Sequence, residues 1–128
     1  MKCISLKQPY AEMLATGKKL IECRKWYTKF RGEFLIHASK TIDVKACEYY
    51  KINSNDIARG SIIGKAKLYD VKKYLDYKEY LIDKDKHFSL NHYNDKIIYG
   101  FLIKNAIRFK QNIPYKGKLG LFEVNEFP

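Results

Sequence analysis

Three charged side chains of the types that bind or activate a ligand lie close together near the N-terminus. Lys19, Glu22 and Arg24 follow Gly17 within a segment that also holds apolar residues. Side chains alternate between the two faces of a strand, so Glu22 and Arg24 are expected side by side. Two interpretations follow: an ion pair that holds a strand in register, or an arginine that grips an anionic ligand while the carboxylate orients it. The spacing alone leaves both open.

The segment after this cluster has the composition of a nucleic-acid-binding loop. It interleaves basic and aromatic residues, namely Lys25, Trp26, Tyr27, Lys29 and Arg31. Basic groups contact phosphates, and aromatic rings stack on bases. The alternative is a solvated loop whose aromatic side chains pack beneath a sheet.

The whole chain carries an excess of positive charge. It has 25 Lys and Arg against 14 Asp and Glu, which gives a formal net charge of +11. Such a balance favours polyanionic partners, and nucleic acid is the first candidate. A Lys-rich composition that serves solubility is the alternative.

Cysteine usage and hydropathy exclude several other classes of protein. Cys3, Cys23 and Cys47 are odd in number and lack a paired spacing, so we expect a reducing cytoplasm and no disulfide framework. The histidines show no metal-site spacing, and we expect neither a metal nor a cofactor. No apolar run is long enough for a signal peptide or a membrane span.

Hydrophobic periodicity predicts an α+β fold in one domain over residues 1–128. The expected strands cover residues 3–6, 20–26, 33–38, 61–71, 97–103 with 107–109, and 121–124. Two or three short helices are expected after Pro9, from about residue 43 to 50, and over 76–82, with loops at 39–41 and 84–95. About six short strands with a few helices fit a small curved sheet or barrel.

Several side chains have predicted orientations within this plan. In the strand over 61–71, one face is expected to carry Ile62, Gly64, Ala66 and Leu68. Val44 and Cys47 are expected to point inward from their helix. His37 is expected on the strand face opposite its apolar neighbours, as a hydrogen-bonded structural residue.

These motifs resemble a known family. The pattern GxKxxExR, formed by Gly17, Lys19, Glu22 and Arg24, is that of the ASCH domain, the activating-signal-cointegrator homology domain. Similarity to its cointegrator-type branch extends to the segments 8–11, 26–32, 60–64 and 114–117, which read QPYA, WYTKFRG, GSIIG and PYKG. The resemblance implies a PUA-like β-barrel, a cleft between the barrel and the first helix, and a role in binding RNA or other nucleic acid.

The resemblance also implies where the site lies. The motif residues would line the cleft, with Gln8 and Tyr10 at its edge and Ser39 and Lys40 nearby. Together with the basic and aromatic loop, the predicted nucleic-acid-binding residues are Gln8, Tyr10, Lys19, Glu22, Arg24, Lys25, Trp26, Tyr27, Lys29, Arg31, Ser39 and Lys40. The leading hypothesis is a monomer that holds a nucleotide or modified base in this cleft.

Two other functions remain as alternatives. Some bacterial members of the wider family remove the acetyl group from N4-acetylcytidine, using a lysine and a threonine of the motif. Lys19 matches that lysine and is the catalytic candidate for a hydrolase of RNA or a modified nucleoside, whether amidohydrolase-like or a ribonuclease. Glu22 stands in place of the threonine nucleophile, which argues against the deacetylase mechanism. The second alternative is a protein-interaction module in transcription or translation regulation.

Overall fold

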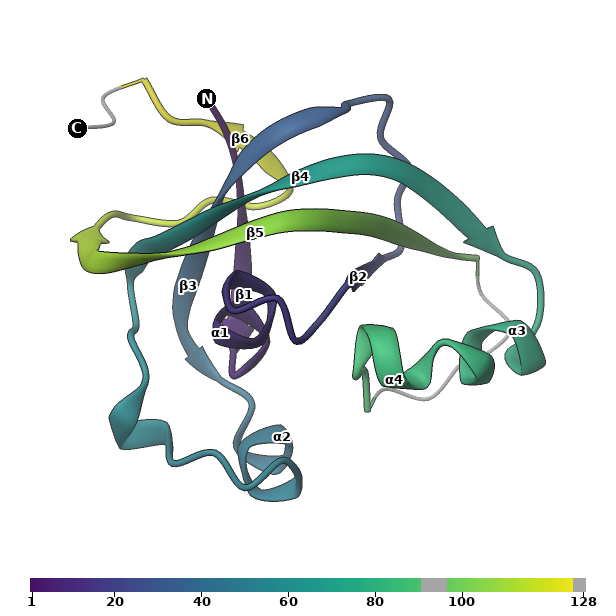
Figure 1. Cartoon of the computed structure of the whole chain (residues 1–128), viewed down its shortest axis with the longest axis horizontal. Helices are drawn as coiled ribbons and strands as arrows, with labels where there is room; N and C mark the ends of the chain where they lie inside the picture. Colours follow the sequence, from purple (N-terminus) through teal and green to yellow (C-terminus); the bar gives the residue numbers. More distant parts are fainter. Residues whose placement is uncertain (91–96, 126–128) are drawn as a thin grey trace.

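A computed structural model describes residues 1–90 and 97–125 of the chain. Within them, one sheet of six strands runs in the order β2-β5-β4-β3-β1-β6 (Figure 1). The pairing of β1 with β3 is parallel, and the other neighbours pair antiparallel. The strands are β1 (Lys2–Gln8), β2 (Ile21–Arg24), β3 (Gly32–Ile42), β4 (Ser61–Tyr74), β5 (Ile98–Pro114) and β6 (Leu121–Glu123).

The sheet is strongly curved but open. Its two edges are β2 and β6, which have four and three residues and pair only with β5 and β1 respectively in the described chain. The predicted α+β class with about six strands is confirmed. The sheet is not closed into a barrel, since β2 and β6 do not pair with each other in the described chain.

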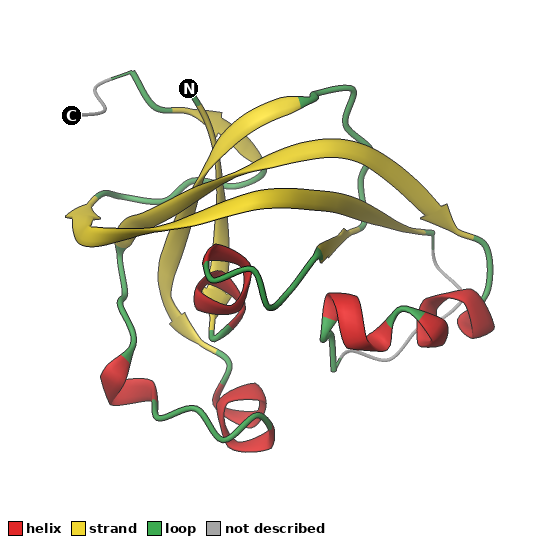
Figure 2. Ribbon diagram, viewed as in Figure 1, coloured by secondary structure: helices red, strands yellow, loops and turns green. Residues whose placement is uncertain are grey.

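The helices are short and lie around the sheet (Figure 2). The described residues form α1 (Tyr10–Ala15), α2 (Val44–Tyr49), a 3-10 turn η1 (Ser54–Asp56), α3 (Tyr77–Ile82) and α4 (Lys84–His87). None of them is long and apolar enough to cross a membrane. The loop predicted over 84–95 is wrong at α4, which continues directly from α3, and its residues 91–96 lie outside the described residues.

The main core fills the concave side of the sheet under α1. It joins Leu14 and Ala15 of the helix to Ile36 of β3, Ala66 of β4 and Phe101 of β5, all nearly inaccessible to solvent. Pro9 precedes α1 and Gly17 follows it with a positive φ of 82°, so the predicted start and end of this helix are confirmed.

A bulge changes the predicted faces of β4. Register shifts interrupt the ladder of β4 with β5 between Ile62 and Gly64. As a result Ile63 points into the main core, whereas Ile62 packs on the opposite face with Leu35. The expectation that Ile62 shares a face with Ala66 is therefore wrong, because the extra residue reverses the alternation.

Two further predictions in the middle of the chain are corrected. Residues 39–41 belong to β3 rather than to a loop, since β3 stays paired with β1 as far as the contact of Ile42 with Gln8. Val44 is exposed rather than inward. The side chain of Asp43 caps α2 by accepting a hydrogen bond from the Ala46 amide, which sets the helix so that Ala46 and Cys47 are buried.

We predict that Gly64→Ala destabilises the fold by about 2 kcal/mol, the range of an overpacked core. A Cβ at this position would lie 2.4 Å from the Ile107 carbonyl oxygen and 3.2 Å from the Ala15 Cβ. The carbonyl belongs to the paired strand β5 and has little freedom to move. Urea unfolding measures the change, and Lys67→Ala on the exposed face of β4 is the control, expected within about 0.5 kcal/mol of wild type. Equal stabilities for the two variants would contradict the packing.

Candidate functional site

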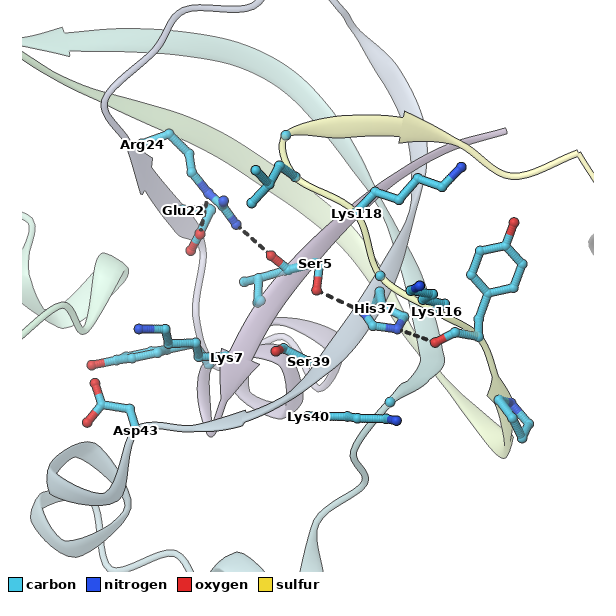
Figure 3. A pocket seen from close by; sticks show the side chains of 18 of the residues that line it. Ser5, Lys7, Glu22, Arg24, His37, Ser39, Lys40, Asp43, Lys116 and Lys118 are labelled. Carbon is cyan, nitrogen blue, oxygen red and sulfur yellow. Dashed lines mark hydrogen bonds and ion pairs between the residues drawn. The ribbon is translucent and has the colours of Figure 1, made fainter.

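A cleft of about 1290 Å³ opens on the face of β1 and β3 that points away from the main core (Figure 3). Ser5 and His37 line it and alternate along their strands with the core residues Ile4, Leu6 and Ile36. Its other walls are the end of β2, the start of α2 and the loop between β5 and β6. The cleft thus lies where parts of the chain that are distant in sequence come together, namely β1, β2, β3 and the loop between β5 and β6.

The Glu22 carboxylate bridges the two other charged residues of the motif. Its Oε1 lies 3.1 Å from the Lys19 ammonium, and its Oε2 lies 2.8 Å from the Arg24 Nε. Burial on its own raises the pKa of Glu22, but the two cations outweigh burial and hold that pKa below its ordinary value. The ion-pair interpretation of the spacing is therefore confirmed, with two cations on one carboxylate.

Lys19 lies behind Glu22 and away from the cleft. Its side chain is 2% exposed. Its ammonium donates to the carbonyl oxygens of Ile21 and His87, each at 2.6 Å, and faces the Glu22 carboxylate. An ammonium has three hydrogens, so these three acceptors satisfy it. The contact with His87 ties the end of α4 to the start of β2.

Arg24 faces the cleft from the end of β2. Besides the bond to Glu22, its Nη2 donates to the Ser5 carbonyl oxygen at 3.0 Å, as the dashed lines in Figure 3 show. These two bonds fix the plane of the guanidinium. Its Nη1 has no acceptor among the described residues, and the side chain is 21% exposed. Arg24 can therefore meet an anion in the cleft without leaving its ion pair.

The structure distributes the other predicted residues of the cleft between two roles. Tyr10, Ser39 and Lys40 line the cleft as the prediction requires. Gln8 is fully buried, and its amide donates to the Ala58 carbonyl at 2.8 Å. Gln8 therefore links β1 to the chain before β4, while its part in binding stays a prediction.

The basic and aromatic loop lies apart from the cleft, since no residue of 25–31 is among those described as lining it. Trp26 packs edge-on against the core ring of Phe101, with centroids 5.2 Å apart. The Arg31 guanidinium donates to carbonyl oxygens of its own loop. The side chains of Lys25, Tyr27 and Lys29 are exposed. This loop presents exposed side chains outside the cleft, and its role in binding remains a prediction.

Sequence reasoning missed most of the positive charge in the cleft. Lys7, Lys116 and Lys118 line it together with Lys40, and none of the four forms an ion pair within residues 1–90 and 97–125. The alternation of Lys7 with the core residue Leu6 was a usable signal. The two other lysines belong to the loop between β5 and β6, whose path over the sheet no local pattern reveals.

His37 is the structural residue that the sequence predicted. Its side chain is almost fully buried, its Nδ1 lies 2.8 Å from the Ser5 hydroxyl, and its Nε2 lies 2.6 Å from the Tyr115 carbonyl oxygen. Burial lowers the pKa of His37, and the Tyr115 carbonyl opposes this only in part. The ring is therefore neutral near pH 7. Across the described chain, no three His, Cys, Asp or Glu side chains gather as metal ligands would.

Comparison with known proteins assigns this chain to a family. The family model of the ASCH domain matches residues 4–113. The chain belongs to the ASCH domain family. The match over most of the chain confirms the family predicted from the motif. ASCH domains are PUA-like and RNA-associated.

The relatives of this ASCH chain are considerably longer proteins. It is similar to human Activating signal cointegrator 1, at 25% identity, and to the mouse protein, at 24%, each over 135 residues. These matches cover 96% of this chain and 22% of each relative, so the chain spans about a fifth of their length.

Solved structures support the fold alone. The crystal structure of ASCH from Zymomonas mobilis superposes with a TM-score of 0.72 at 15% identity, covering 98% of this chain and 87% of that one. A structure of a variant of the same bacterial protein gives a TM-score of 0.71 at 15% identity, with 98% and 88% covered.

We predict that Glu22→Gln lowers the free energy of unfolding by about 3 kcal/mol at pH 7, because it leaves the buried Lys19 ammonium without its counterion. Since the folded pKa of Glu22 is lowered, its stabilisation is complete above the ordinary glutamate pKa of about 4.3 and disappears as the pH falls through the folded value. The difference between wild type and variant should therefore narrow in acid. Urea unfolding at several pH values measures it.

The matched control is Glu33→Gln. Glu33 pairs with Lys65 at 3.3 Å but is 57% exposed, so its loss should cost about 0.5 kcal/mol or less. A Glu22 variant as stable as this control at pH 7 would show that the Glu22 carboxylate does not hold the site together.

Proposed function

We propose that this ASCH domain binds single-stranded RNA, with a nucleotide or modified base held in the cleft. The observation that carries the proposal is the set of lysines that line the cleft without ion pairs in the described chain, Lys7, Lys40, Lys116 and Lys118. Unpaired lysines grouped in a concavity attract phosphates and release counterions when they bind them.

The charge balance of the cleft supports an anionic ligand. Five basic side chains and two carboxylates are among the described residues that line it. Glu22 is already neutralised by Lys19 and Arg24. The other carboxylate, Asp43, accepts the capping hydrogen bond of α2 at 3.0 Å. The cleft therefore presents a net positive charge to a ligand.

The shape of the cleft supports a ligand larger than one small molecule. Its volume of about 1290 Å³ exceeds the range of roughly 300–1000 Å³ for small-ligand sites. Three side chains that line it can contact a base. Tyr10 offers an aromatic ring, while the Arg24 guanidinium and the Asp43 carboxylate can form hydrogen bonds with the edge of the base. Such edges are accessible in unpaired strands, which is why single-stranded RNA fits better than a duplex.

Binding has more support than hydrolysis at Lys19. A lysine that acts as a base or nucleophile must be deprotonated and reach the substrate. The Lys19 ammonium instead donates to two carbonyl oxygens and faces a carboxylate, and it is 2% exposed behind the wall of the cleft. A protein ligand in the same cleft is an alternative outcome that the binding experiment distinguishes.

We predict that Lys116→Ala/Lys118→Ala weakens binding of a labelled single-stranded RNA and flattens its salt dependence. Loss of two phosphate contacts should reduce the slope of log K against log salt by about 1.4, taking about 0.7 per contact on a single strand. Fluorescence anisotropy between about 50 and 200 mM salt measures both quantities.

A charge-matched control is Lys73→Ala/Lys110→Ala. Both lysines are exposed and neither is among the residues described as lining the cleft. This double variant removes the same net charge and should keep the wild-type affinity and slope to within the error. Equal losses in the two double variants would mean that RNA responds to the total charge and not to the cleft. Absence of RNA binding by the wild type at low salt would refute the proposed function.

A further inference from the structure

The lysine loop, residues 115–120 between β5 and β6, carries two of the cleft lysines across the face of β1 and β3. It is not part of a strand, yet its start is fixed at two points. The Tyr115 amide donates to the Gly60 carbonyl oxygen at 3.1 Å, and the Tyr115 carbonyl accepts from His37 at 2.6 Å. In Figure 3 this loop passes beside Ser5 and His37, with Lys116 and Lys118 at the cleft.

The hydrogen bonds of His37 have a defined direction. A carbonyl oxygen can only accept, so Nε2 of the ring carries the hydrogen and donates it to Tyr115. In a neutral imidazole Nδ1 is then the acceptor, and the Ser5 hydroxyl donates to it at 2.8 Å. One chain of bonds thus runs from Ser5 on β1 through His37 on β3 to the lysine loop. Because His37 is 2% exposed, water hardly competes for these bonds.

Gly117 lies directly on this chain of bonds. A Cβ at Gly117 would come within 2.7 Å of Cε1 and 2.9 Å of Nδ1 of His37, and within 3.0 Å of the Ser5 Oγ. Real Cβ atoms essentially never approach within 3.0 Å, so a larger residue at 117 must displace either the loop or the His37 ring and separate the two. The residues on either side of this contact are Lys116 and Lys118.

We propose that His37 is the positioning residue of the cleft, holding the lysine loop on the sheet so that Lys116 and Lys118 meet RNA phosphates. This inference rests on the proposed function and assigns the phosphate contacts to a specific part of it. The ring supplies the hydrogen bond that fixes the loop, and Gly117 supplies the space for close contact. Released from the ring, the loop would no longer hold Lys116 and Lys118 at the cleft, so fewer cations would meet phosphates in the complex.

The test is the salt dependence of RNA binding by His37→Ala. His37 is neutral near pH 7, so this substitution removes no charge, and a merely structural residue would leave the slope unchanged. We expect the slope of log K against log salt to fall by about 1.4, as in Lys116→Ala/Lys118→Ala. We also expect the lysine substitutions to have little further effect in the His37→Ala background, because coupled residues are not additive.

Gly117→Ala provides a second variant if His37→Ala fails to fold. It keeps His37 and every charge, and it lies on a loop whose backbone is part of the cleft wall and not of the main core. It should reproduce the loss of slope. Hydrogen exchange of the amides of residues 115–120 in the free protein should be faster in both variants than in wild type.

The outcomes separate this inference from the proposed function. Two results would overturn the role of His37 and leave RNA binding intact. One is exchange of the lysine-loop amides as slow in His37→Ala and Gly117→Ala as in wild type. The other is a wild-type salt slope in both of these variants while Lys116→Ala/Lys118→Ala loses affinity. Absence of binding by wild type would overturn the proposed function, and the assignment of phosphate contacts with it. Faster exchange together with the loss of slope would support both.

Discussion

The cleft depends on one carboxylate that neutralises a buried lysine. Placing the Lys19 ammonium at 2% exposure has a large desolvation cost unless it is paired and hydrogen-bonded, and Glu22 provides the countercharge. The same carboxylate holds Arg24, which in turn binds the Ser5 carbonyl of β1. Through Lys19 it also reaches His87 at the end of α4. Three parts of the chain therefore share a single ionic centre beside the four-residue strand β2.

This centre explains why the motif contributes little net charge to the ligand. Two cations and one carboxylate leave one positive charge, and of the two cations it is Arg24 that faces the cleft. The remaining attraction comes from lysines on other elements. The Lys40 side chain runs past Gly60. A Cβ at Gly60 would lie 3.2 Å from its carbon chain, so the glycine leaves room for the lysine beside the cleft. The motif shapes the wall, and the lysines around it supply the charge.

Local chemistry in the sequence predicted the parts of the fold that depend on neighbouring residues. Pro9 and Gly17 bound α1, the helix expected over 76–82 forms α3, and strand alternation brings Glu22 beside Arg24. Two of the parts that failed depend on distant residues. β3 continues past Ala38 because β1 pairs with it, and the bulge near Ile62 follows from the ladder with β5.

The candidate site shows the same division. The Lys19 ammonium points away from the cleft and donates to the carbonyl oxygen of His87, 68 residues away. The lysine loop is held at the cleft by the hydrogen bond between Tyr115 and His37, 78 residues apart. Neither contact has a local signal. Trp26 is of a residue type that often stacks on bases, yet its ring packs against Phe101 of the core. Residue types therefore indicated the chemistry, while long-range pairing decided which side chains face the cleft.

The most direct test of the central claim is to map the contacts of bound RNA by photo-crosslinking a thiouridine-labelled single strand and identifying the modified peptides by mass spectrometry. Binding in the cleft predicts crosslinks to peptides that contain Tyr10, Lys40 and Lys116, which line it. Crosslinks confined to residues 25–31, or an absence of specific crosslinks under conditions where RNA binds, would contradict it.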